Sequence, residues 1–254
     1  MQQSPLYDTT LVAMGIPARS DPQTGAQWIT RGPLSVATRL GPDVDLSHLR
    51  DLCGRRFCIV SPDKASAKPL HDAGFRQIMT PATIAELDLT RPMAPHVKWR
   101  NAVKLAKKSP VKTKHRVFHP TTDYWILQTD LAQQKLNKYR GLPHGILHNW
   151  PKRDRHISLA YEGKTPVAAM VFLRHETTVT YQIGWTGLRG RKHNAHQLLL
   201  HEATRHFAAK GVTKIDLGTA DSVNAPGLAR FKARSGATFR MLGGTWIAQP
   251  RWRS

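Results

Sequence analysis

Acidic residues are scarce in this chain. Its 254 residues include 17 Asp and Glu against 38 Lys and Arg, a formal net charge of +21 with neutral histidines. Such an excess predicts attraction to polyanions, because the summed field concentrates them at the surface and bound phosphates release condensed counterions. A solvated basic surface with no specific ligand is the alternative that composition alone leaves open.

Cysteine is almost absent as well. The two thiols, Cys53 and Cys58, stand in CGRRFC, a spacing that does not match a C-x₂-C metal pair, and no second pair follows. We therefore predict two buried free thiols, which fits a reducing cytoplasm. The histidines are too scattered to form a ligand set, so we expect no metal site.

Long apolar runs are also missing. No stretch reaches the roughly 18 residues that a membrane span requires. The segment MQQSPLYDTTLVAM has no basic start followed by an apolar stretch, so it does not resemble a signal peptide. These absences predict a cytoplasmic protein without a membrane span, while 40% hydrophobic residues indicate a folded chain.

Strand and helix patterns alternate along the chain. Residues 27–37 are predicted as strand, turn and strand, and residues 56–62 as a short buried strand. Residues 156–185 alternate and are rich in β-branched side chains, which predicts three antiparallel strands. A helix capped by Asn194 follows, then the strand VTKIDLG, and TFRMLGGTWIAQP is predicted as one final strand. The fold class is mixed α+β.

A basic segment separates the two halves. Between Arg91 and Phe118 the chain carries basic residues and no Asp or Glu. Its apolar positions predict a helix with one basic face that ends before Pro110. Trp99 could stack on a base, but we favour a place in the core for it. The candidate nucleic-acid contacts on this helix are Lys98, Arg100, Lys104, Lys107 and Lys108.

The segment from 181 to 218 reads YQIGWTGLRGRKHNAHQLLLHEATRHFAAKGVTKIDLG. It is predicted as a strand, a basic loop, a helix and a second strand. A helix N-terminus after such a loop is an anion site, because free N–H groups and the positive end of the helix dipole converge there. A cofactor pyrophosphate, a nucleic-acid phosphate and no ligand at all remain open.

This order of elements resembles the Gcn5-related N-acetyltransferase (GNAT) fold, and several segments resemble its Fem-type aminoacyltransferases. The matching segments are RGP (31–33), GFRQIMTPATIAELDLTRP with KWRNAVKLAKK, NAHQLLLHEATRHFAAKGVTKIDLG and NAPGLARFKARSGA. The resemblance implies a mixed, mostly antiparallel sheet flanked by helices. It also implies a reduced GNAT-like N-terminal unit in residues 1–90 and a GNAT-like catalytic domain in residues 91–254. Fem-type enzymes are longer, so their acceptor is not carried over.

The same resemblance bears on the acyl donor. GNAT enzymes that use coenzyme A generally place Q/R-x-x-G-x-G/A before the main helix, where glycines let backbone amides approach the pyrophosphate. This chain has Arg191-Lys192-His193-Asn194-Ala195 there, and Fem-type enzymes are similar in lacking the glycines. Aminoacyl-tRNA is therefore the predicted donor, with no resident cofactor. An acyl-coenzyme A N-acyltransferase and a non-catalytic nucleic-acid-binding module remain open.

Candidate residues can be given for catalysis, for the donor phosphates and for the acceptor loop. Lys232 in RFKARSGA matches a Fem-type lysine placed to meet the carbonyl or the tRNA end. Asp216, at a strand end, could accept the amine proton or cap the next turn. Arg189, Arg191, Lys192, His193 and Asn194 would meet the donor phosphates, and Asn224, Gly227 and Phe231 would shape the acceptor loop. The predicted reaction is amide formation on an amine-bearing acceptor, of unknown identity and with unknown oligomeric state of the enzyme.

Overall fold

The computed structural model describes residues 1–64, 67–139 and 141–251. The chain divides into two compact units, unit 1 with Met1–Ile84 and Arg240–Ser254, and unit 2 with Ala85–Phe239. The sequence-based division placed the whole C-terminal segment in the second domain. Instead, the chain returns to unit 1 at Arg240, because its last strand pairs with strands of that unit.

Unit 1 is built on a six-stranded sheet in the order β1-β2-β3-β4-β13-β5. Strands β3 and β4 are parallel and joined by helix α2, whereas the neighbouring pairs are antiparallel. Trp28, Phe75 and Trp246 lie in its core, and Cys53 and Cys58 are buried free thiols, as predicted. Its elements are α1 (Pro5–Ala13), β1 (Ala18–Ser20), β2 (Gln27–Arg31), β3 (Leu34–Leu40), α2 (Leu46–Cys53), β4 (Phe57–Pro62), α3 (Ala67–Asp72), β5 (Arg76–Met79) and β13 (Thr245–Ala248).

Unit 2 is built on a seven-stranded sheet in the order β12-β6-β11-β10-β9-β8-β7, and its strands β6 and β12 begin or end in unit 1. The elements before its central strands are β6 (Thr83–Asp88), α4 (Val97–Lys108), β7 (Val111–Val117), α5 (Tyr124–Leu136), α6 (Gly145–Asn149) and the 3₁₀ turn Lys152–Asp154. The others are β8 (Arg155–Glu162), β9 (Thr165–His175), β10 (Thr178–Thr186), α7 (Leu188–Lys192), α8 (Ala195–Ala208), β11 (Lys214–Thr219), α9 (Pro226–Arg234) and β12 (Thr238–Met241).

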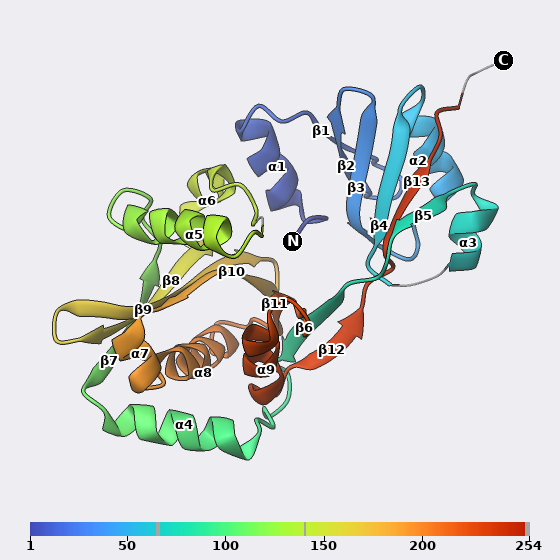
Figure 1. Cartoon of the computed structure of the whole chain (residues 1–254). Coiled ribbons are helices and arrows are strands. Elements are labelled where there is room, and N and C mark those ends of the chain that lie inside the picture. Colours follow the sequence, from blue (N-terminus) through green and yellow to red (C-terminus); the bar gives the residue numbers. More distant parts are fainter. Residues whose placement is uncertain (65–66, 140, 252–254) are drawn as a thin grey trace. The chain divides into compact units, whose positions relative to one another are not determined.

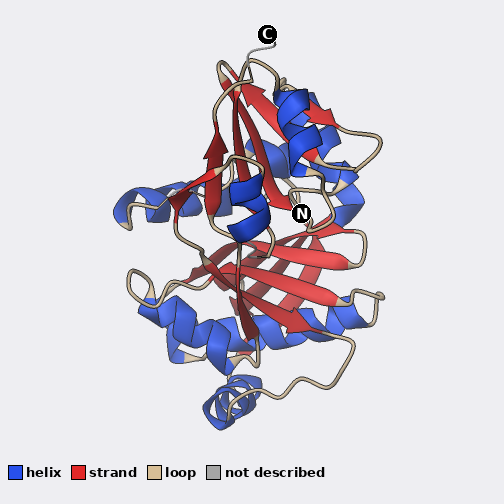
Figure 2. Cartoon of the chain, turned by 90° about the vertical axis from the view of Figure 1, so that its right-hand side faces the viewer, coloured by secondary structure: helices blue, strands red, loops and turns tan. Residues whose placement is uncertain are grey.

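Helices flank the sheet of unit 2 on both faces (Figure 1). Helix α8 buries Leu199, Ala203 and Phe207 against one face and packs beside α4, while α5 and α6 lie over the other face. Figure 2 shows in red the strands of both units with their helices in blue. The predicted mixed α+β class and the mostly antiparallel sheet are confirmed. None of the described helices is both long and apolar enough to cross a bilayer.

The sheet of unit 2 opens between its two parallel strands. Strands β10 and β11 pair only from Thr178↔Lys214 to Thr180↔Asp216. Beyond these positions β10 continues to Thr186 and β11 to Thr219 without pairing to each other. Parallel strands joined by a helix and then parting leave backbone groups and side chains of both strands available to a ligand.

Three local predictions need correction. The basic loop before α8 contains a helical turn, α7, because its amides bond back along the chain. Asn194 stands at the N-cap of α8, but its φ is 52° and its side chain makes no capping hydrogen bond; asparagine tolerates this left-handed conformation well. The predicted final strand is two strands, β12 and β13, in different sheets, with Gly243 and Gly244 between them.

Candidate functional site

A cavity of about 230 Å³ lies at the N-terminus of α8, where α4 and α9 approach it. We call it the α8 cavity. It brings together Lys98, Asn194, Gly227 and Phe231, which the sequence analysis took from three separate segments. The described lining residues are Lys98, Trp99, Ala102, Asn194, Gln197, Gly227, Arg230, Phe231 and Arg234.

Hydrogen-bond donors and positive charge dominate the α8 cavity. Lys98, Arg230 and Arg234 contribute cations, and the described lining residues include no acidic side chain. The buried Nε1–H of Trp99 donates to none of the described residues. The first N–H groups of α8 have no acceptor within their own helix, and Asn194 does not cap them with its side chain. This arrangement suits an anionic ligand, because every contribution has the same sign.

The backbone before α8 does not form a pyrophosphate cradle. Arg191 N donates to Gly187 O at 2.9 Å, His193 N to Arg189 O at 3.1 Å, and Asn194 N to Arg191 O at 3.2 Å. These amides are therefore occupied by α7 and cannot also wrap around a diphosphate. Gly190 serves packing, since a Cβ there would lie 2.2 Å from the carbonyl oxygen of Val167.

The basic side chains of α7 lie apart from the α8 cavity. Arg189 and His193 approach Glu162 at the end of β8, with nitrogen–oxygen distances of 3.6 and 3.5 Å. Arg191 and Lys192 are exposed and, like Arg189 and His193, are not among the described residues that line the cavity. Of the five predicted phosphate contacts, Asn194 is the one that lines it.

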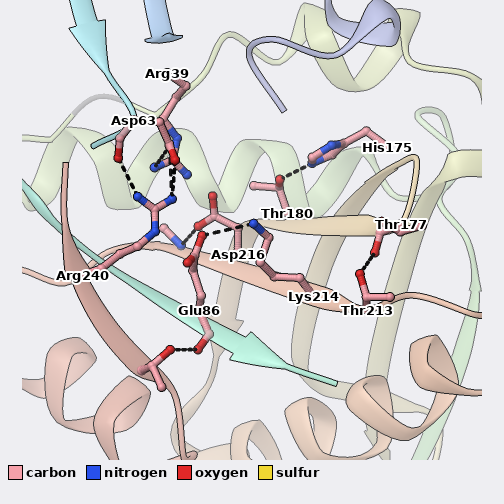
Figure 3. A network of polar contacts seen from close by, with 12 residues as sticks. Arg39, Asp63, Glu86, His175, Thr177, Thr180, Thr213, Lys214, Asp216 and Arg240 are labelled. Carbon is pink, nitrogen blue, oxygen red and sulfur yellow. Dashed lines mark hydrogen bonds and ion pairs between the residues drawn. The ribbon is translucent and has the colours of Figure 1, made fainter. Parts of the chain in front are cut away.

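Lys232 and Asp216 lie close together but deep in unit 2. Lys232 is 3% exposed and its Nζ donates to the carbonyl oxygen of Thr219 at 2.6 Å. Asp216 Oδ1 accepts from Gly218 N at 2.7 Å, the turn-capping role considered for it, and Figure 3 shows Asp216 beside the Glu86–Lys214 ion pair. Burial lowers the pKa of Lys232 to about 8, which the charge of Asp216 partly opposes. Neither side chain lines the α8 cavity among the residues described.

The spacing along α9 explains which of its residues face the cavity. Gly227, Arg230, Phe231 and Arg234 follow the i, i+3, i+4, i+7 pattern of one helix face, and all four line the cavity. Lys232 lies about 100° around the helix from Phe231 and points to the sheet instead. The sequence analysis missed Arg230, Arg234 and Gln197, although helical periodicity applied to NAPGLARFKARSGA identifies the two arginines.

The other predicted site residues, on α4 and in the loop before α9, differ in how exposed they are. All five basic residues of α4 are exposed, and Lys107 forms an ion pair with Glu202 at 3.5 Å. Trp99 is 3% exposed and packs edge-on against Phe231, with ring centroids 4.9 Å apart, so its favoured place in the core is confirmed. Asn224 lies outside the cavity, where its Nδ2 donates to Asp221 Oδ2 within the loop at 2.7 Å.

A partly buried pair connects the first turn of α8 to the open part of the sheet. The Tyr181 hydroxyl and His196 Nε2 share a hydrogen bond at 3.3 Å. Burial raises the pKa of Tyr181 and lowers that of His196 to about 4, so both are neutral near pH 7. Gly184 is required beside them, because a Cβ at that position would overlap the tyrosine hydroxyl.

Part of the chain is similar to a known family of domains. Residues 137–233 match the family model described as "Acetyltransferase (GNAT) domain". The match spans α6 to most of α9, and so includes Asn194 and Phe231 of the α8 cavity. No curated protein sequence is similar enough to match the chain.

Solved structures extend the similarity to both units. FemX has a TM-score of 0.73 at 12% sequence identity, covering 96% of this chain and 90% of its own. The C-terminal domain of a putative lysylphosphatidylglycerol synthetase from Agrobacterium fabrum has a TM-score of 0.63 at 14% identity, covering 99% and 89%. L-PGS from Bacillus licheniformis has 0.62 at 13%, covering 96% and 88%. Residues 137–233 are thus similar to a GNAT acetyltransferase domain, and the fold of the chain is similar to that of FemX.

Proposed function

We propose that the protein transfers an aminoacyl group from aminoacyl-tRNA to an amine, forming an amide bond. The observation that supports this most is the α8 cavity, where Lys98, Arg230 and Arg234 meet the N-terminus of α8 and the described lining residues include no acidic side chain. The acceptor end of a tRNA has separate phosphate groups, rather than a diphosphate, and a terminal base that could bind in such a cavity. Phe231, partly exposed beside the cations, offers the aromatic face on which a base stacks.

The backbone of α7 favours tRNA over coenzyme A as donor. A diphosphate needs several free amides converging on it, and α7 uses those of Arg191, His193 and Asn194 internally. The net charge of +21 suits a long polyanion, whose many phosphates lie beyond any one cavity. Two similar structures are named lysylphosphatidylglycerol synthetase or L-PGS, and lysyl is an aminoacyl group.

Transfer of an aminoacyl group to an amine does not require a covalent intermediate on the protein. An aminoacyl ester is already activated, so the site must position it, stabilise the developing oxyanion and present a deprotonated amine. Tyr181 remains protonated because burial raises its pKa, so its hydroxyl can donate a hydrogen bond to an oxyanion where β10 leaves β11. Lys232, bonded to Thr219, would hold the end of β11 in place rather than contact the carbonyl.

An acyl-coenzyme A donor is the second candidate, because the matching family model is described as an acetyltransferase domain. In that case the cations of α4 and α9 would hold the phosphates through side chains. A module that binds nucleic acid without catalysis is the third, and it predicts binding without transfer.

Parallel titrations with bulk aminoacylated tRNA and with acetyl-coenzyme A, each at 50 and 200 mM salt, test the donor. If the acceptor end contributes about four phosphate contacts at a slope of about 0.7 each, tRNA affinity falls by roughly 30–50-fold between the two salts. Deacylated tRNA is the control for the aminoacyl group. We expect no saturable binding of acetyl-coenzyme A; its saturable binding, undisplaced by charged tRNA, would overturn the proposed donor.

A further inference from the structure

A second polar site lies on the opposite face of the sheet, under α5 and α6. It is a cavity of about 30 Å³, and Asp130, Tyr139, His144 and Gln182 are its polar lining side chains. Leu142, Ile146, Leu173 and Ile183 are among the apolar residues that complete its wall. We call it the Asp130 cavity. Nothing in the sequence analysis pointed to it.

Asp130 is the centre of this site. The residue is 7% exposed, and its carboxylate accepts hydrogen bonds from Gln134 Nε2 at 2.7 Å, His144 Nε2 at 2.8 Å and Tyr139 Oη at 3.2 Å. A neutral His144 that donates from Nε2 must carry its lone pair on Nδ1. Nδ1 bonds to none of the described residues, so the pair has the arrangement of a carboxylate that orients a general base.

The small size of the Asp130 cavity and its carboxylate favour a small cationic group. A volume of about 30 Å³ has room for one or two water molecules, and so for an amino group at the end of a substrate. In a chain of net charge +21, a buried carboxylate beside a small void is a local site for a cation. Tyr139, whose pKa burial and Asp130 raise to about 12, stays protonated and cannot compete as a second anion.

The Asp130 cavity lies next in sequence to a residue that contacts α8. Gln182 lines the cavity and follows Tyr181, which bonds His196 of α8. Burial is the main cause of the raised pKa of Tyr181, and the carboxylate of Asp130 adds to it. Because β10 and β11 are unpaired from Tyr181 onward, an acyl group held at the α8 cavity meets the sheet where it is open.

We propose that the Asp130 cavity binds the primary ammonium group of the acceptor and that His144 is the base that deprotonates it. This inference rests on the proposed function. The ammonium nitrogen gives one proton to His144 Nδ1, and its freed electron pair forms the C–N bond to the ester carbonyl carbon. The C–O bond to the tRNA ribose then breaks, and the second amine proton ends on the leaving oxygen. His144 returns its proton to water.

The groups facing His144 set the conditions for this step. They are Asp130 from α5 and Tyr139 from the following loop. From β8, the Arg155 guanidinium donates to the carbonyl oxygens of Leu147 and His148 at the end of α6, at 2.8 and 2.7 Å. Asp130 holds the ring through Nε2, so Nδ1 is the nitrogen left to accept the proton.

Histidine-ring nuclear magnetic resonance of the full chain tests the binding step, with methylammonium chloride as the probe. We expect a ring with its proton on Nε2 that the substitution His144→Gln removes, and saturable shifts of that ring on titration. Tetramethylammonium chloride, too large for a 30 Å³ cavity, serves as control at equal ionic strength. Asp130→Asn should abolish the response. Equal shifts with both ions, or none with methylammonium, would overturn the amine site.

Aminolysis of bulk aminoacyl-tRNA by methylamine tests the base. We expect His144→Gln to lower the rate about 100-fold or more, to remove the acid limb of the pH–rate profile and to leave tRNA affinity unchanged. His148→Gln, an exposed histidine of the same helix α6, is the matched control and should keep the wild-type rate. An unchanged profile in His144→Gln would refute the base. If wild type fails to bind charged tRNA, the donor proposal fails, while the methylammonium titration still decides the amine site.

Discussion

Simultaneous replacement of Lys98, Arg230 and Arg234 by glutamine is expected to weaken aminoacyl-tRNA binding by about 100-fold near 0.1 M salt. Each cation–phosphate contact of this kind contributes about 1 kcal/mol, and 1.4 kcal/mol is a tenfold change in affinity. The slope of log affinity against log salt should also become shallower by about 2, at roughly 0.7 per lost contact. Fluorescence titration of labelled aminoacyl-tRNA at several salt concentrations measures both quantities.

A control variant distinguishes the effect of the α8 cavity on tRNA binding from the effect of net charge. Lys112, Lys114 and Lys164 are exposed on β7 and the β8–β9 turn, and replacing them by glutamine removes the same three charges. We expect this variant to bind within a few-fold of wild type. Equal losses in the two variants would mean that tRNA responds to net charge alone, and that the α8 cavity does not recognise it.

Acidification from pH 7 to pH 4 is expected to lower the free energy of unfolding by about 5 kcal/mol through a cluster of buried and partly buried histidines. His115 lies against His206, with ring centroids 3.7 Å apart, and against His156 at 5.4 Å. Burial lowers the pKa of His115 to about 3 and of His156 to about 4, and neighbouring cations and imidazoles add to both shifts. Burial and the charge of Lys210 also lower the pKa of His206.

The direction of this effect follows from proton uptake. The unfolded chain protonates these histidines near pH 6.5, whereas the folded chain keeps His115 and His156 neutral down to about pH 3 and 4. The stabilisation is therefore complete above pH 6.5 and decreases toward pH 4, at up to about 1.4 kcal/mol per pH unit for each histidine. Between these limits the unfolded state binds more protons, so lower pH favours unfolding.

Urea unfolding at pH 7, 5.5 and 4 measures this dependence. Wild type should lose stability steeply, and His115→Gln should lose less over the same range because one titrating group is gone. His119→Gln, at an exposed position nearby, should keep the wild-type slope. A His115→Gln slope as steep as wild type would show that carboxylates, not this histidine cluster, govern the acid transition.

Sequence periodicity predicted the framework of unit 2 well. Strands β8 and β9 are buried almost continuously, and α4 and α8 have apolar faces at helical spacing, so burial of apolar side chains decides their structure. Strand β7 was missed because Lys112, Lys114 and Arg116 make it resemble a continuation of the basic segment. It forms because its backbone pairs with β8 along its whole length.

The candidate site was predictable only in part. Lys98, Asn194, Gly227 and Phe231 were each singled out from local patterns, but their convergence on one cavity was not predicted. Which residues of α9 line that cavity depends on how the helix is rotated about its axis. Lys232 matched a motif, yet its place in the helix directs it to Thr219. Asp130 and His144 are 14 positions apart, and their contact depends on how the chain after α5 folds back, which no local pattern encodes.

Photo-crosslinking from the 3′-terminal adenosine of charged tRNA tests the central claim most directly. A tRNA that carries 8-azidoadenosine at its 3′ end is bound, irradiated and digested, and the labelled peptides are identified by mass spectrometry. We predict labelling of peptides that contain Gln197 or Phe231 of the α8 cavity, and competition by unlabelled charged tRNA but not by acetyl-coenzyme A. Labelling confined to other segments, or abolished by acetyl-coenzyme A, would contradict the proposed donor site.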